Sequence, residues 1–237
     1  MRRTMKQIPW AKPEFLGNER TYVLDALDST WISGGPYVDR FEAAFAEFCG
    51  CRYGVATANG TVALHLALVA LGIGPGDEVI VPTFTFVAPA NVVKHVGATP
   101  IFVDCDPHTW CLDPRQVEAA ITKRPKAIIP VHVYGYPCDM KAICALAAHH
   151  ELAVVEDGAQ AHGSKSDGRS VGGFGIVGCF SFHAAKTLTT GEGGMFATRH
   201  GEVAEGVTKL RAFGVDRSHG ERAIPGMYDV PTLGLNY

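Results

Sequence analysis

The sequence predicts an α/β protein whose mainly parallel, seven-stranded sheet carries helices on both faces. Two observations lead to this prediction. Seven short runs of strand-forming residues recur along the chain, and helical patterns separate most of them. The runs are apolar throughout, which is typical of strands that are buried on both faces of a parallel sheet.

The predicted strands span residues 52–57, 78–82, 100–104, 127–133, 153–157, 177–182 and 193–198. The predicted helices between them span residues 62–71, 88–96, 114–121 and 140–150. Asp113, which precedes Pro114, and Asp139 are predicted helix caps, because a carboxylate can accept the unpaired N–H groups of a first helical turn. The loop before the final strand has little helical character, so this strand is free to run antiparallel.

Residues 1–36 are predicted to form an N-terminal arm and a helix, ahead of a main domain at residues 37–237. The helical pattern at residues 19–29 places three apolar side chains on one side: Val23, Leu24 and Leu27. A second helix, from residue 39, carries an aromatic stripe for which core packing is expected: Phe41, Phe45 and Phe48.

The composition is that of a soluble globular protein with one substantial core, because 47% of the 237 residues are hydrophobic. The 21 Lys and Arg residues nearly balance the 24 Asp and Glu residues, which argues against nucleic acid or an anionic membrane as partner. No apolar run is long enough for a signal peptide or a membrane span. Seven cysteines without a CxxC pair indicate reduced thiols in a cytoplasmic protein, with no disulfide frame and no metal site.

Lys186 is the residue around which the chemistry of this chain is predicted to be arranged. It stands in a polar, Gly-rich turn between two predicted strands, and no other Lys or Arg lies between residues 178 and 198. The turn follows the carboxyl end of a buried strand, where open α/β sheets bind ligands, and Ser181 and His183 lie nearby. The alternative is an ordinary solvated lysine, but a partly desolvated amine at such a place can form a Schiff base.

An anion site is predicted where the first strand of the sheet meets the next helix. Asn59 and Gly60 form the turn, and Thr61 is expected to cap the helix. Exposed N–H groups at a helix start bind anions such as phosphate, although most turns of this kind bind nothing. The chain has neither GxGxxG nor GxxxxGK[ST], so a dinucleotide or P-loop site is disfavoured.

Two further segments add a carboxylate and an aromatic ring. Asp157 follows an apolar strand, where a buried carboxylate needs a positive partner unless it only caps the next turn. Gln160 and His162 could each hydrogen-bond a ligand. For His162 we expect a structural role instead, with its ring nitrogens hydrogen-bonded within the protein. Phe84 and Phe86 project to one side if their run stays extended, and could form the floor of a pocket for a flat ring rather than pack in the core.

These pieces together fit one ligand, pyridoxal 5'-phosphate (PLP). A phosphate cradle, an aromatic floor, a carboxylate for the ring nitrogen and a lysine for the aldehyde are the groups that this cofactor needs. The chain also resembles the DegT/DnrJ/EryC1/StrS aminotransferases, which are fold type I enzymes. The segments that carry this resemblance are NGTVALHLAL, GDEVIVPTFTFVAPAN, GATPIFVDCDPHT, KAIIPVHVYG, VVEDGAQAHG and CFSFHAAKTLTTGEGGM.

The resemblance implies a role for each candidate residue. Lys186 would bond the cofactor and shuttle protons, Asp157 would face the pyridine nitrogen, and Gln160 would lie near the ring hydroxyl. Phe86 would stack on the ring. The phosphate would bind at three further residues: Gly60, Thr61 and Ser181.

Other contacts implied by the resemblance lie near the two ends of the chain and beside the lysine. Asn236, in LGLNY, would reach the cofactor phosphate of a neighbouring subunit, so a homodimer with shared active sites is expected. Four residues are candidate substrate contacts: Trp31, Ser33 and Gly34 in TWISGGP, and His183.

The implied activity is transfer of an amino group from an amino acid, L-glutamate being the usual donor, to a nucleotide-linked keto sugar in amino-sugar and polysaccharide biosynthesis. A related group of enzymes that removes a sugar hydroxyl has histidine in place of the lysine, so Lys186 favours transamination. Sugar dehydration and a truncated, non-catalytic PLP-binding subunit are the alternatives. Family members continue past LGLNY into a smaller domain, so residues 37–237 are expected to be the PLP-binding large domain alone.

Overall fold

The structure, a computed structural model, describes residues 9, 11–122, 124–215 and 229–237. Its central feature is a seven-stranded sheet with the strand order β1-β9-β8-β5-β4-β2-β3. The strands are β1 (Tyr53–Thr57), β2 (Glu78–Pro82), β3 (Thr99–Val103), β4 (Pro125–Ile128), β5 (Ala153–Asp157), β8 (Val177–Ser181) and β9 (Gly194–Thr198). Only β9 runs against its neighbours, β1 and β8, within this sheet. The prediction of a mainly parallel sheet is therefore confirmed.

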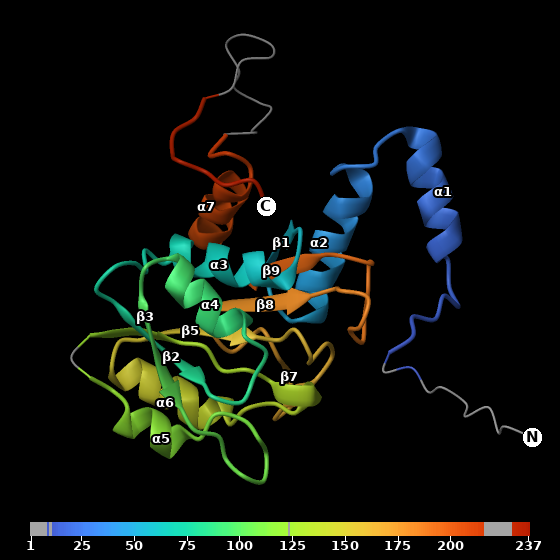
Figure 1. Cartoon of the computed structure of the whole chain (residues 1–237). Helices are drawn as coiled ribbons and strands as arrows, with labels where there is room; N and C mark the ends of the chain where they lie inside the picture. Colours follow the sequence, from blue (N-terminus) through green and yellow to red (C-terminus); the bar gives the residue numbers. More distant parts are fainter. Residues whose placement is uncertain (1–8, 10, 123, 216–228) are drawn as a thin grey trace, which may run out of the picture.

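Helices cover both faces of the sheet (Figure 1). They are α1 (Glu19–Ser29), α2 (Pro36–Phe48), α3 (Gly60–Ala70), α4 (Ala88–His95), α5 (Pro114–Ala119), α6 (Met140–His149) and α7 (Gly201–Arg211), with a 3-10 turn η1 (Val133–Gly135). Two very short strands, β6 (Lys165–Ser166) and β7 (Arg169–Ser170), form a separate hairpin. Neither this hairpin nor α7 was predicted.

The core has two layers because successive side chains of each strand point to opposite faces. Val79 and Val81 pack with α3 and α4 in one layer, whereas Ile80 between them packs with α5 and α6 in the other. The two predicted caps are confirmed: Asp113 accepts a hydrogen bond from Arg115 N, and Asp139 accepts one from Ala142 N.

The two N-terminal helices are less buried than the sequence predicts. In α2, Phe45 is buried and Phe41 is half-buried, but Phe48 is exposed, so the predicted stripe of three core residues is wrong at its last member. Helix α1 buries none of its residues, and its apolar side chains Val23 and Leu24 face solvent. Figure 1 shows α1 standing away from the sheet beside α2. The division of the chain at residue 36 stays a prediction.

None of the described helices is both long and apolar enough to cross a membrane.

Candidate active site

A cavity of about 540 Å³ lies at the carboxyl ends of the parallel strands. Segments that are far apart in the sequence line it: the start of α3, the turn before α4, the end of β5 and the connection between β8 and β9. Eight predicted site residues are among the lining residues: Gly60, Thr61, Phe86, Asp157, Gln160, Ser181, His183 and Lys186. The fold thus brings the predicted phosphate cradle, aromatic ring, carboxylate and lysine around one space.

The start of α3 forms one end of this cavity. Asn59, and not Thr61 as predicted, is the helix cap, since its side chain accepts a hydrogen bond of 3.0 Å from Val62 N. The first N–H groups of a helix have no intrahelical acceptor, so those of Gly60 and Thr61 are left for a ligand. A Cβ atom on Gly60 would stand only 2.7 Å from Ser181 Cβ. Glycine at this position therefore lets the helix start approach the end of β8, as the predicted anion site requires.

Asp157 lies at the end of β5 and is 6% exposed. Its carboxylate accepts one hydrogen bond, of 3.0 Å from Ala159 N, among the described residues. Burial raises the pKa of Asp157, and this effect is only partly offset by the hydrogen bond from Ala159 N and by the nearby His132 and Lys186 side chains. The carboxylate is thus short of compensating charge, and a cationic N–H in the cavity would supply it.

The preceding residue, Glu156, is a fully buried carboxylate whose charge the chain itself compensates. It accepts backbone N–H groups from Gly172, Phe174 and Gly175 at 2.6–2.8 Å. His132 Nδ1 accepts a hydrogen bond from the backbone, so its Nε2 carries the proton that faces Glu156 at 3.2 Å. Sequence analysis missed this anchor, although an acidic residue within an apolar strand is a recognisable sign of one.

Lys186 is half-buried in the connection between β8 and β9. Within the described part of the chain, no side chain forms an ion pair or hydrogen bond with its ammonium group. The nearby carboxylate of Glu192 lies 3.8 Å from His183 instead. The lysine amine is therefore available for a ligand in the cavity, as a Schiff-base lysine must be.

Phe86 and Gln160 lie on the sides of the cavity. Phe86 is 69% exposed, which excludes core packing as its role. Phe84 packs on Trp110 and does not line the cavity, and the run between β2 and α4 does not stay extended. The side-chain carbonyl of Gln160 accepts the backbone N–H of Tyr134 at 2.9 Å, which leaves its amide N–H₂ for a ligand.

His162 is not the satisfied histidine that was expected. Neither ring nitrogen has a hydrogen-bond partner among the described residues, and the ring lies between Phe45, Phe180 and Phe182. Burial lowers its pKa to about 4. The ring is therefore neutral at physiological pH and contributes to the aromatic packing beside the site.

Four predicted contacts do not line this cavity. Trp31, Ser33 and Gly34 lie in the connection between α1 and α2, and the indole of Trp31 is exposed. Asn236 is also exposed and pairs with Ala212 at the end of α7. Their roles as substrate contacts and as a contact to a neighbouring subunit stay predictions.

Comparison with known proteins decides the family. The sequence profile of the DegT/DnrJ/EryC1/StrS aminotransferase family matches residues 14–237. The chain belongs to this aminotransferase family. It is 48% identical over 234 residues to GDP-perosamine synthase of Caulobacter vibrioides, covering 98% of this chain and 61% of that protein. It is 47% identical to GDP-perosamine synthase of Escherichia coli O157:H7, covering 98% and 62%.

Solved structures agree with this membership. An aminotransferase from Psychrobacter cryohalolentis superposes with a TM-score of 0.90 at 40% identity, covering 97% of this chain and 59% of that one. The chain thus spans about three fifths of the length of the relatives that it matches. The residues matched by the family profile include all the described strands of the sheet, so the fold prediction holds at the level of the family as well.

Proposed function

We propose that this chain forms the PLP-binding part of an aminotransferase that moves an amino group from L-glutamate to a nucleotide-linked keto sugar. The observation that carries the proposal is that Lys186, Asp157 and the open start of α3 border the same cavity. The lysine amine has no partner among the described side chains, so it is available to a ligand. The buried carboxylate of Asp157 lacks compensating positive charge. PLP presents an aldehyde, a ring nitrogen and a phosphate to match.

The residues fit the cofactor as follows. The N–H groups of Gly60 and Thr61, with the hydroxyl of Ser181, would hold the phosphate, and Phe86 would cover one face of the ring. When bound, PLP supplies an electron sink for the carbon that loses its proton. Asp157 would keep the ring nitrogen protonated, because a carboxylate buried beside it favours the cationic form.

Lys186 is proposed as the general base and acid. Its amine borders the cavity, so it would take the proton from the donor carbon and return it to the cofactor carbon. The nearby Glu192 and His183 face each other at 3.8 Å, so they do not hold the lysine in an ion pair. The lysine can therefore reach the reacting carbon from the connection between the two strands.

The acceptor is proposed to be a GDP-linked keto sugar, because two similar relatives carry the name GDP-perosamine synthase. We also propose that the enzyme works in the cytoplasm, which free thiols at all seven cysteines support.

A homodimer with shared active sites is part of the proposal. Helix α1 presents exposed apolar side chains, and a second subunit could cover them. Asn236 is exposed and lies outside the cavity of its own chain, which suits a contact to a neighbour's cofactor. Asn236→Ala should then weaken PLP binding in the dimer. A monomer that binds PLP at full affinity would contradict this arrangement.

The activity is tested in two halves. The protein loaded with PLP is mixed with L-glutamate, and the release of 2-oxoglutarate is followed together with the loss of the visible absorption of the lysine-bound cofactor. A GDP-linked keto sugar is then added, and the product is weighed by mass spectrometry. An amino sugar supports the proposal, whereas a dehydrated product without nitrogen, or PLP binding without release of 2-oxoglutarate, would overturn it.

A further inference from the structure

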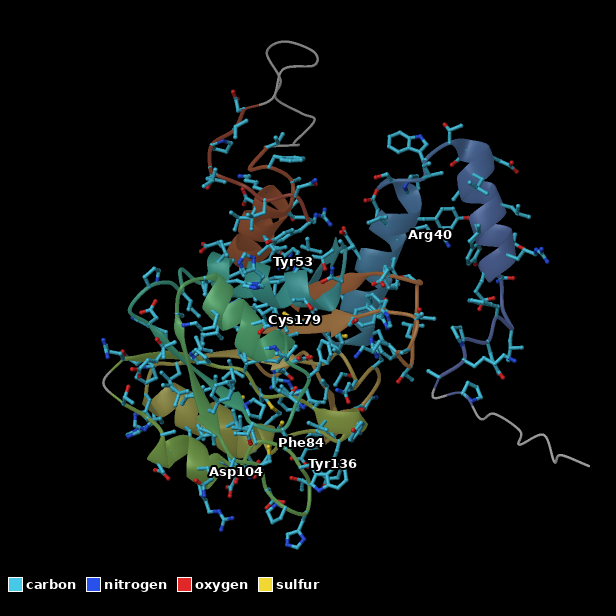
Figure 2. All side chains as sticks on the ribbon, viewed as in Figure 1. Arg40, Tyr53, Phe84, Asp104, Tyr136 and Cys179 are labelled. Atoms are coloured by element: carbon cyan, nitrogen blue, oxygen red, sulfur yellow. The ribbon has the colours of Figure 1, made fainter. Side chains whose placement is uncertain are left out.

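Three aromatic side chains from three different loops meet beside the cavity. Phe84 follows β2, Trp110 follows β3 and Tyr134 lies in η1, and we call these three residues the aromatic platform. Their ring centroids are 5.6 Å (Phe84 to Trp110), 6.1 Å (Trp110 to Tyr134) and 6.5 Å (Phe84 to Tyr134) apart. The rings meet edge to face and remain substantially exposed, with 52% of Trp110 accessible. Figure 2 labels Phe84, a member of the platform, and Asp104, which lies in the same loop as Trp110; both are near the lower end of the view.

Two members of the platform are held in an unfavourable backbone conformation. Trp110 has φ 61° and Tyr134 has φ 51°, in the left-handed region that bulky residues rarely adopt. Each is fixed by its neighbours: Trp110 N donates to Asp106 O at 2.8 Å, and Tyr134 N donates to the side chain of Gln160 at 2.9 Å. Glycine would relax both positions, and the neighbouring hydrogen bonds hold the two backbones in this conformation instead.

The platform continues directly from the cavity that is proposed to hold the cofactor. Gln160 lines that cavity, and its side-chain carbonyl accepts the backbone N–H of Tyr134. Phe84 is followed at once by Thr85 and Phe86, which also line the cavity. A ligand that places one end at Lys186 and extends past Gln160 would therefore reach the three rings.

The charges near the platform favour a base over a phosphate. Asp104 and Asp106 lie in the same loop as Trp110. Hydrogen bonds from Thr109 N and His108 N lower the pKa of Asp106, so its carboxylate stays ionised and repels anions. A flat heterocycle with N–H groups suits aromatic faces flanked by carboxylates, since every base can stack and its N–H groups can donate.

We infer that the aromatic platform binds the nucleobase of the nucleotide-linked sugar by stacking. This inference rests on the proposed function for the identity of the substrate. It assigns to Phe84, Trp110 and Tyr134 the nucleotide end of the substrate, with the keto sugar toward Lys186. The platform thereby sets the position of the sugar without touching the reacting atoms.

Binding is measured on the PLP-loaded protein with GDP, which has the base and lacks the sugar. GDP should quench the fluorescence of Trp110, and inorganic pyrophosphate, which has no base, should not. In Trp110→Phe the quenching should vanish while calorimetry still detects GDP binding, because a stacking ring remains. GDP binding that leaves the fluorescence unchanged would overturn the inference, and so would equal quenching by pyrophosphate.

Trp110→Gly separates binding from folding. Glycine relaxes the φ of 61°, so the Tm should be equal or higher, while the Kd for GDP should rise about 5- to 100-fold with the loss of stacking. Phe213→Gly is the matched control, since Phe213 also has φ 61° and is 56% exposed but lies beside α7, outside the platform. It should leave the Kd for GDP unchanged.

Two further readouts decide among the remaining explanations. Release of 2-oxoglutarate from glutamate should be the same in Phe213→Gly and the natural protein, and a failure in both would refute the proposed function while the GDP titration still tests the platform. A lower Tm with an unchanged Kd for GDP would mean that the rings only support the fold. Dissociation of a dimer by Trp110→Gly, with GDP affinity unchanged, would mean that the platform is a contact between subunits.

Discussion

Gly60→Ala tests the close approach that builds the proposed phosphate cradle. The added Cβ would stand 2.7 Å from Ser181 Cβ and 3.1 Å from Phe180 O, both shorter than the 3.4–4 Å of ordinary contact. Overpacking of this kind costs about 1–3 kcal/mol. The lower chain entropy of alanine offsets about 0.4–1 kcal/mol of that cost. We therefore expect a net loss of about 1–2 kcal/mol, or a Tm lower by about 2–8 °C for a chain of this size.

The same change should weaken PLP binding. The helix start has to move away from Ser181 to make room, so at least one N–H donor to the phosphate is misplaced. A hydrogen bond to a charged group contributes about 1.5–3 kcal/mol, which corresponds to a Kd for PLP about 10- to 150-fold higher. Thermal unfolding with and without PLP, together with equilibrium dialysis, measures both effects.

Gly206→Ala is the matched control in an ordinary helix. Nothing lies within 4 Å of a Cβ added at this interior position of α7. Alanine should therefore raise the stability by about 0.5–1 kcal/mol and leave PLP affinity unchanged. The reasoning about the cradle is refuted if Gly60→Ala unfolds at the natural Tm and binds PLP with the natural Kd.

Three further predictions concern ionisable groups. Lys186→Ala should abolish release of 2-oxoglutarate and the visible absorption band while phosphate-anchored PLP binding partly survives; the exposed Lys165→Ala should change neither absorbance nor rate. Burial raises the pKa of Asp157 above 3.8, so stability of the PLP-free protein should fall as the pH rises through that raised value. Asp157→Asn should flatten this fall in a pH series of Tm values and weaken PLP binding; an unchanged slope would contradict it. Burial lowers the pKa of His162 from 6.5 to about 4, so stability should fall by roughly 2 kcal/mol, after allowance for partial exposure, as the pH drops across that interval. His162→Leu should remove this acid-side loss, and the exposed His149→Leu should retain it.

The sequence was sufficient for the sheet and for the residues that gather at its carboxyl edge. Buried strands can be recognised by unbroken apolar runs, and the residue that follows such a parallel strand must lie at the carboxyl edge of the sheet. Lys186 and Asp157 could be placed in this way, because the position of each depends on one strand end. Asn59 could have been identified as the α3 cap, since asparagine before a Gly-Thr pair is a favoured cap.

Contacts between loops could not be predicted because they depend on how the strands are ordered. Trp110 and Tyr134 come from loops that follow β3 and β4, and β2 lies between these two strands in the sheet. The backbone of both residues is left-handed without glycine, which no local pattern indicates. Phe48 was misplaced because helical spacing gives the side of α2 on which a residue lies, but not whether the rest of the chain covers that residue.

The reversed direction of β9 determines how Lys186 is held at the edge of the sheet. A parallel β9 would have required a crossover connection on one face of the sheet. Because β9 is antiparallel to β8, a direct loop at the carboxyl end of β8 is enough to join them. Backbone hydrogen bonds hold the two ends of this loop together, since Phe182 N donates to Gly193 O and Thr190 N donates to Phe182 O. The backbone N–H of Lys186 donates to His183 O, so the position of its Cα is fixed by the loop itself. If Lys186 is the proposed catalyst, its long side chain can change bonding partner without any rearrangement of these backbone hydrogen bonds.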